Sequence, residues 1–133
     1  MAGAQTGVLE LPYQASAAII KNRFVKLSGD QTVAQVAASN DLVLGVATID
    51  ISTSNFQGVN EVTAGKATAV RVLGVAWVEA GAAVTRGDII MPDTVGRAIT
   101  RTATNRPCGI ALKAASAAGE LIPVLLNFSL PTA

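Results

Sequence analysis

The chain has no histidine and a single cysteine, Cys108, among its 133 residues. The absence of histidine removes the commonest general base and the commonest transition-metal ligand, and it excludes the usual serine triads. Cys108 lacks the base that would activate it as a nucleophile, and one thiol forms neither an internal disulfide nor a metal cluster. No calcium loop, phosphate loop or dinucleotide fingerprint is present either. We therefore expect no catalytic residue, no metal and no cofactor, and we interpret Cys108 as a small buried hydrophobe.

Charged and aromatic side chains are also scarce. Charged residues make up 14% of the chain, against about 25% in average proteins. The net charge of +1 argues against a general nucleic-acid binder. No uncharged apolar run approaches the ~18 residues that span a bilayer, and no basic segment precedes the early apolar stretch, so we expect neither membrane insertion nor a secretion signal. Half of the residues are apolar, and this surplus predicts that part of the surface meets another protein.

An internal repeat is the most informative feature of the sequence. FVKL and GVA recur as DIIM and GIA at an offset of 64 positions (88 minus 24, and 109 minus 45), and AGKATAVRV recurs as AGELIPVLL at an offset of 54 (118 minus 64). The first copy therefore holds ten extra residues between its second and third segments. We place repeat one at about residues 19–80, with an insertion at 49–62, and repeat two at about 81–128.

Each copy has the pattern of several short strands. Val, Ile and Thr are enriched, and turn residues recur every few positions, which is typical of a compact all-β sandwich or barrel. The prediction is one β domain over residues 19–133. The spacing of Val33 and Val36 is compatible with a helix, so one short helix near 37–41 or 114–118 stays open. We interpret Trp77, inside the apolar run VLGVAWV, as a core residue.

Three sets of residues are candidates for contact with a partner. Pro12 bars a regular helix in residues 1–18, so we expect an extended arm there that could add a strand to a partner sheet, although a frayed terminus is equally compatible. Phe56 is a large aromatic in the polar insertion, which suits either an interface anchor or a ring tucked onto its own domain. Arginines cluster locally ahead of the GIA motif, where they could meet an acidic patch or simply face solvent. The candidates are Val8, Leu9, Leu11, Pro12 and Tyr13 in the arm, Asn55, Phe56 and Gln57 in the insertion, and Arg97, Arg101 and Arg106 in the basic cluster.

The second half of the chain contains GAAVTRGDII at residues 81–90 and a further run rich in small and apolar residues from Thr94 to Leu126. With these segments the chain resembles the decoration (cement, or head-stabilising) proteins of tailed-phage capsids, and the resemblance extends over about residues 7–128. The family's glycine step, G-hydrophobic-Ala strand and small-residue turn match Arg86-Gly87-Asp88, Gly109-Ile110-Ala111 and Ala117-Ala118-Gly119. The first half is similar but more diverged, and its insertion departs from the shortest members.

This resemblance implies a β-clip-like or β-tulip-like domain that is made in the host cytoplasm and resides on the virion. It implies a homotrimer on the outer capsid surface, at three-fold and quasi-three-fold positions, where it clamps neighbouring major capsid protein subunits and stabilises the expanded shell. An N-terminal arm that reaches the capsid also fits the family.

Two other classes of function stay open. A ligand- or glycan-binding β module of a virion fibre or surface protein would need an exposed Trp or Tyr beside polar groups. A β-clip enzyme such as a nucleotide hydrolase would need a metal-binding carboxylate and a phosphate-gripping motif, and the sequence contains neither. We therefore expect a structural virion protein rather than an enzyme.

Overall fold

The computed structural model describes residues 7–48, 61–102 and 105–128, and these residues form strands, turns and loops without a helix. The prediction of a small all-β domain is confirmed. The strands are β1 (Gly7–Ala15), β2 (Ile19–Ile20), β3 (Phe24–Gly29), β4 (Thr32–Gln35), β5 (Val43–Ala47), β6 (Glu61–Val62), β7 (Ala67–Glu79), β8 (Ile89–Pro92), β9 (Ala98–Thr100), β10 (Gly109–Ala111) and β11 (Leu121–Leu126).

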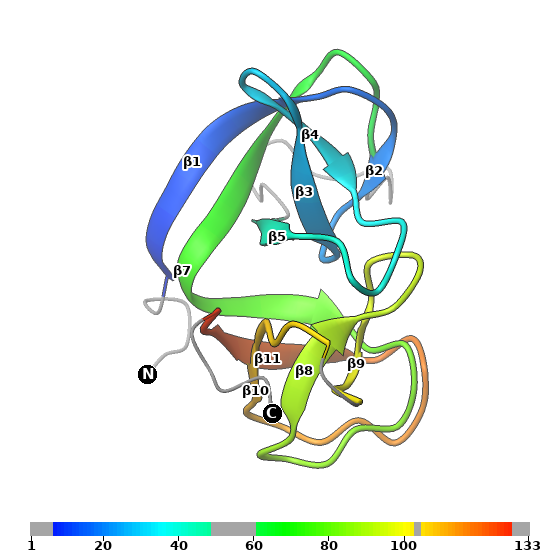
Figure 1. Ribbon diagram of the computed structural model, residues 1–133. Coiled ribbons are helices and arrows are strands. Elements are labelled where there is room, and N and C mark those ends of the chain that lie inside the picture. Colours follow the sequence, from blue (N-terminus) through cyan, green and yellow to red (C-terminus); the bar gives the residue numbers. More distant parts are fainter. Residues whose placement is uncertain (1–6, 49–60, 103–104, 129–133) are drawn as a thin grey trace.

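Two small barrels share the long strand β7 (Figure 1). The strand order is β1-β4-β3-β5-β7-β11-β10-β8-β9, and an additional pairing between β1 and β7 closes the first five strands into a barrel. The remaining strands form the second barrel, which closes through a parallel bridge between Ala80, directly after β7, and Ala98 in β9. In Figure 1, β7 runs down the upper barrel and then bends to lie across the lower one.

The repeat predicted from the sequence is present in the hydrogen-bonded pairings. Val46 of β5 pairs with Arg71 of β7, and Ile110 of β10 pairs with Leu125 of β11 at the expected offsets. The parallel contact of Ala15 with Val33 returns as the bridge between Ala80 and Ala98. The second half of β7 is therefore the counterpart of β1, so the second copy begins inside β7 and the two barrels overlap in one strand.

The boundary expected after residue 18 does not coincide with a break in the fold. Residues of β1 pair antiparallel with β7, from Gly7 with Gly74 to Gln14 with Ala67, and the end of β1 pairs parallel with β4. Residues 7–15 thus supply one wall of the first barrel. The short ladder between β2 and β6 lies in a separate two-stranded sheet, and β6 lies at the end of the predicted insertion.

Mostly Val and Ala side chains fill both barrel interiors, together with a few larger ones. Ile19, Val33 and Val70 lie in the core of the first barrel, while a second cluster runs from Phe24 through Ala76 to Ile122. Two glycines permit the strands to close. A Cβ on Gly45 would collide with the carbonyl oxygen of Arg71, and a Cβ on Gly109 would collide in the same way with the carbonyl oxygen of Leu125. The glycines of the recurring GVA and GIA motifs therefore lie where two strands approach each other closely.

Replacing Gly45 with alanine should lower the free energy of unfolding by about 3 kcal/mol, because a rigid backbone oxygen occupies the new methyl position. Gly109→Ala should cost about the same. Gly65→Ala is the matched control: its φ is +87° but nothing lies within 4 Å of the added Cβ, so only about 1 kcal/mol of backbone strain is expected. Urea denaturation followed by circular dichroism measures all three, and equal losses at Gly45 and Gly65 would show that the strands can separate to admit the methyl group.

Candidate interaction surfaces

The described residues offer surfaces for binding rather than a cluster of reactive groups. Across residues 7–48, 61–102 and 105–128, no group of three or more His, Cys, Asp or Glu side chains gathers to hold a metal ion. In the same ranges the structure contains no helix that is long and apolar enough to cross a membrane. The features that stand out instead are an apolar sheet face on the second barrel and an apolar groove between the two barrels.

The outer face of the second barrel is lined with large apolar side chains. We call it the Trp77 face, and it comprises Val75 and Trp77 of β7, Ile110 of β10, and Leu121, Pro123 and Leu125 of β11. In the strand register Trp77 lies opposite Pro123, Val75 lies opposite Leu125, and Leu125 lies opposite Ile110. Trp77 is 46% exposed, Leu121 44% and Leu125 39%. Exposed apolar side chains that adjoin one another in this way mark interaction surfaces.

The interpretation of Trp77 as a core residue was wrong. Side chains alternate between the two faces of a strand, and in β7 the even-numbered residues Ala76 and Val78 are fully buried. Trp77 therefore points outward. The continuous apolar run around it resembled a strand buried on both faces, but only one face of β7 is covered within this chain.

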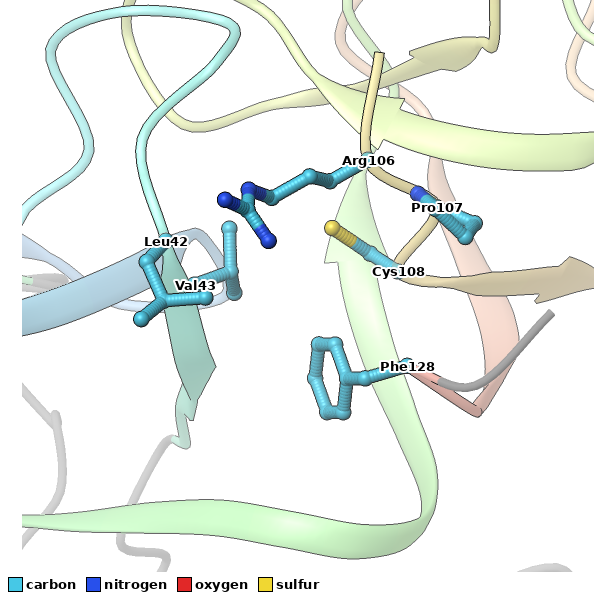
Figure 2. Close-up of a pocket in the computed structure, with 6 residues that line it drawn as sticks. All are labelled: Leu42, Val43, Arg106, Pro107, Cys108 and Phe128. Carbon is cyan, nitrogen blue, oxygen red and sulfur yellow. The ribbon is translucent and has the colours of Figure 1, made fainter. Parts of the chain in front are cut away.

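An apolar groove lies where the two barrels meet (Figure 2). Leu42 and Val43, at the start of β5, face Phe128, which follows β11. Arg106 extends over the opening beside Pro107 and Cys108, and an adjoining hollow continues from Leu42 and Phe128 to the neighbouring strand β3. Leu42 is 70% exposed and Phe128 37%. We call this hollow, lined by Lys26, Leu27, Leu42, Val43, Leu44, Arg106, Pro107, Cys108 and Phe128, the Phe128 groove.

Cys108 lines this groove but is only 1% exposed. Burial raises the pKa of its thiol from 9.0 to about 12, because an apolar environment disfavours the thiolate. The interpretation of Cys108 as a small buried hydrophobe is confirmed. The raised pKa lowers the thiolate fraction at neutral pH and therefore makes Cys108 less reactive as a nucleophile than an exposed cysteine.

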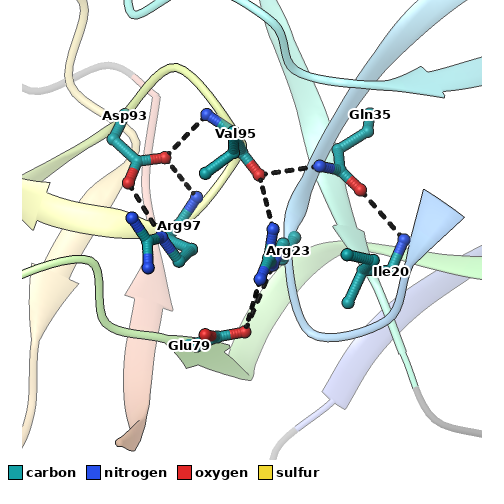
Figure 3. A network of polar contacts seen from close by, with 7 residues as sticks. All are labelled: Ile20, Arg23, Gln35, Glu79, Asp93, Val95 and Arg97. Atoms are coloured by element: carbon teal, nitrogen blue, oxygen red, sulfur yellow. Dashed lines mark hydrogen bonds and ion pairs between the residues drawn. The ribbon is translucent and has the colours of Figure 1, made fainter. Parts of the chain in front are cut away.

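A polar network fixes the two barrels against each other (Figure 3). The guanidinium of Arg23, next to β3, forms an ion pair with Glu79 at the end of β7 at 3.1 Å, and it also donates to the carbonyl of Val95 in the β8–β9 turn. Gln35 of β4 donates to the same carbonyl at 2.9 Å. Asp93 holds the turn in shape by accepting hydrogen bonds from the backbone N–H groups of Val95 and Arg97. The surfaces on the two barrels therefore have a fixed relative orientation.

The structure separates the residues that the sequence singled out as partner contacts. The arm residues lie in β1, where Leu9 is 40% exposed and Leu11 and Tyr13 are partly buried. The side chain of Val8 and the loop residues Asn55, Phe56 and Gln57 lie outside the part of the chain that the structure describes. Their roles stay predictions.

The structure places the three arginines of the basic cluster before β9, after β9 and ahead of β10. Arg97 precedes β9 and forms an ion pair with Asp93 at 3.0 Å. Arg101 follows β9 and donates its backbone N–H to Ile89. Arg106 is exposed and lines the Phe128 groove. Of the three arginines, Arg106 is the one whose charge is placed at the mouth of a hollow.

Sequence reasoning missed both apolar surfaces. The signal for the Trp77 face was the alternation in the second half of β7 and in β11, where the buried residues Ala76, Val78, Ile122 and Val124 are small or β-branched and alternate with Trp77, Leu121 and Leu125. The Phe128 groove had no comparable signal, because its residues come from four separate segments of the chain and meet only after folding.

A two-barrel all-β body with adjoining exposed apolar side chains is typical of proteins that bind other proteins. Comparison with known families makes this specific: the model of the phage cement protein family matches residues 4–126. The chain belongs to that family, whose members are structural proteins of the virion. The resemblance stated from the sequence is confirmed.

A solved structure supports the fold. The crystal structure of the N base of the head fiber gp8.5 in bacteriophage phi29 is similar to this chain with a TM-score of 0.66 and 21% sequence identity. The match covers 91% of this chain and 95% of that chain. No curated protein sequence matches the chain significantly. At this identity the similarity shows a shared fold.

The Cys108 thiol should react with Ellman's reagent at pH 8 at least about a hundredfold more slowly in the native protein than in denaturant, because with a pKa of about 12 its thiolate fraction is on the order of one in ten thousand. The raised pKa also makes folding favour the protonated form. The stabilisation of the folded state that results is fully present below the usual pKa of 9.0, and it is lost as the pH rises towards 12. Rapid native labelling would contradict the burial of this thiol.

Removing the guanidinium in Arg23→Ala should lower the free energy of unfolding by about 2 kcal/mol, because it leaves the partly buried Glu79 carboxylate without its donor and removes one of the two donors to the Val95 carbonyl. Lys66→Ala, which deletes an exposed cation on the turn that leads into β7, should change it by less than about 0.5 kcal/mol. Chemical denaturation compares the two variants, and equal small losses would mean that the network does not hold the barrels together.

Proposed function

We propose that this protein binds the outer surface of a phage capsid and strengthens the expanded shell by clamping neighbouring major capsid protein subunits. The binding positions are the three-fold and quasi-three-fold axes, and the protein occupies them as a homotrimer after its synthesis in the host cytoplasm. It works without catalysis, in agreement with the buried, protonated state of its one thiol and the absence of histidine.

The observation that carries this proposal is the pair of apolar surfaces on a rigid body in a member of the cement protein family. A clamp must bind two partners at a fixed distance and angle. The shared strand β7 and the Arg23 network hold the two barrels in one orientation, so force applied at one surface is transmitted to the other without a hinge.

The Phe128 groove and β1 are the surfaces that we assign to the capsid. Leu42 and Phe128 provide exposed apolar area in the Phe128 groove, and Arg106 provides a positive charge at the edge of this groove. A segment of the capsid protein that carries an apolar side chain next to an acidic one complements this groove in shape and charge. Leu9 of β1 is a further exposed apolar contact.

A glycan- or ligand-binding module is the alternative function, and the exposure of Trp77 is the observation that favours it. Sugars bind where an aromatic ring lies beside polar groups. The side chains paired with Trp77 and Val75 across the sheet are Pro123 and Leu125, which are apolar. A surface of this composition suits another protein better, so this function comes second. If the protein binds on a glycan array and Trp77→Ala abolishes this binding, glycan binding becomes the preferred function.

The function is tested with expanded capsids that lack the protein. Addition of the purified protein should saturate a fixed number of sites per shell and raise the temperature at which the heads release DNA. Cosedimentation gives the binding curve, and a DNA-dye release assay gives the stability. If the protein fails to cosediment with expanded capsids, the proposal is wrong.

Reversing the charge at the groove, in Arg106→Glu, should weaken capsid binding about tenfold, which corresponds to about 1.4 kcal/mol. Arg86→Glu makes the same change of charge at another exposed position of the second barrel and should leave the affinity unchanged within a factor of two or so. Equal effects of both variants would show that only net charge matters and that the groove is not the contact.

Point substitutions are preferable to a deletion of residues 1–12, which would remove most of β1 and open the first barrel.

A further inference from the structure

The internal repeat allows the Trp77 face to be compared with the equivalent outward positions of the first barrel. Because the two barrels share one register, each outward position of the second has a counterpart in the first. The pair Val75 and Leu125 corresponds to the pair Glu10 and Arg71, at offsets of 65 (75 minus 10) and 54 (125 minus 71). In the first barrel these two positions hold an ion pair between the Glu10 carboxylate and the Arg71 guanidinium.

The neighbouring cross-strand pair also has larger apolar side chains in the second barrel than in the first. Pro12 and Ala69 are paired in the first barrel, and their counterparts in the second are Trp77 and Pro123. The fold therefore tolerates small or charged residues at these outward positions, since the first barrel closes with them. The large apolar side chains of the second barrel are not needed for the fold, so their presence calls for a partner that covers them.

The charges that border the Trp77 face already have partners in the same chain. Glu79, at the end of β7, is bound by Arg23, and Arg71, on the other side of Gly74, is bound by Glu10. Near the start of β11, the pKa of Glu120 is held below its usual range by a hydrogen bond from the Ser116 hydroxyl and also by the charge of Lys113. None of the six residues of the face is charged, and the side chains of Glu79, Arg71 and Glu120 at its border are bound within the same chain.

We infer that the Trp77 face binds the Trp77 face or the adjoining edge of a second copy of this chain. A face without net charge meets its own copy without placing like charges opposite each other. Interfaces between identical subunits are also more apolar than the surfaces used for exchangeable partners. This inference rests on the self-association in the proposed function and adds which surface mediates it, which leaves the Phe128 groove free for the capsid.

The experiment transplants the polar pair of the first barrel onto the second. In Val75→Glu/Leu125→Arg the new carboxylate and guanidinium occupy the register positions that Glu10 and Arg71 occupy in the first barrel, so the fold has a precedent for them. The matched control, Val75→Ile/Leu125→Met, changes the same positions but keeps them apolar. Sedimentation equilibrium measures the self-association of all three proteins, and circular dichroism checks their folding.

Trp77 is the only tryptophan of the chain, so its fluorescence reports directly on the face. The wild type and the apolar control should form oligomers whose emission shifts to shorter wavelength as concentration rises. The transplanted variant should be folded and monomeric, with red-shifted emission that does not depend on concentration and with self-association weakened at least about a hundredfold.

Three results would overturn the inference: a wild type that is monomeric up to millimolar concentration, a transplanted variant that associates as tightly as the wild type, or Trp77 emission that stays constant while the protein associates. Capsid cosedimentation of the same proteins is read separately. A wild type that associates through this face but never binds capsids leaves the inference intact and contradicts the proposed function. A monomeric wild type whose capsid binding is lost in the transplanted variant assigns the face to the capsid instead.

Discussion

Strand β7 belongs to both barrels, and this single constraint determines most of what the surface presents. A strand that closes two barrels must turn the same set of alternating residues inward along its whole length. Val70, Ala76 and Val78 fill the interiors, so the residues between them are committed to the outside. Gly45 permits the close approach of β5 to β7, and Gly109 permits the close approach of β10 to β11. The exposure of Trp77 is a consequence of this geometry.

Much of the fold could be predicted because it is encoded locally and twice. Recurrence of GVA as GIA, and of the segments after Gly65 and Gly119, located equivalent strands from the order of the residues alone. The all-β class followed from composition and turn spacing. The sharing of β7 could not be predicted. Two repeats that overlap in one strand have the same order of segments along the sequence as two separate repeats that follow an N-terminal arm. The apolar run VLGVAWV in β7 likewise did not indicate which face of the strand would be buried inside the barrel.

The candidate surfaces show the same division between local and nonlocal information. Buried Cys108 was predicted correctly from its small and apolar neighbours, because such a residue needs only an ordinary core. The Phe128 groove depends on Leu42 and Phe128, which lie far apart in the sequence and meet at the junction of the barrels. Among the three arginines, the chain alone could not show that Arg97 is occupied by Asp93 while Arg106 borders a hollow.

The account as a whole is tested most directly by cryo-electron microscopy of expanded heads decorated with the purified protein. It predicts three copies around each occupied three-fold or quasi-three-fold axis, with the Trp77 faces buried between copies and the Phe128 grooves on the capsid protein. Isolated single copies, or density in which the Trp77 face lies on the capsid protein, would contradict it.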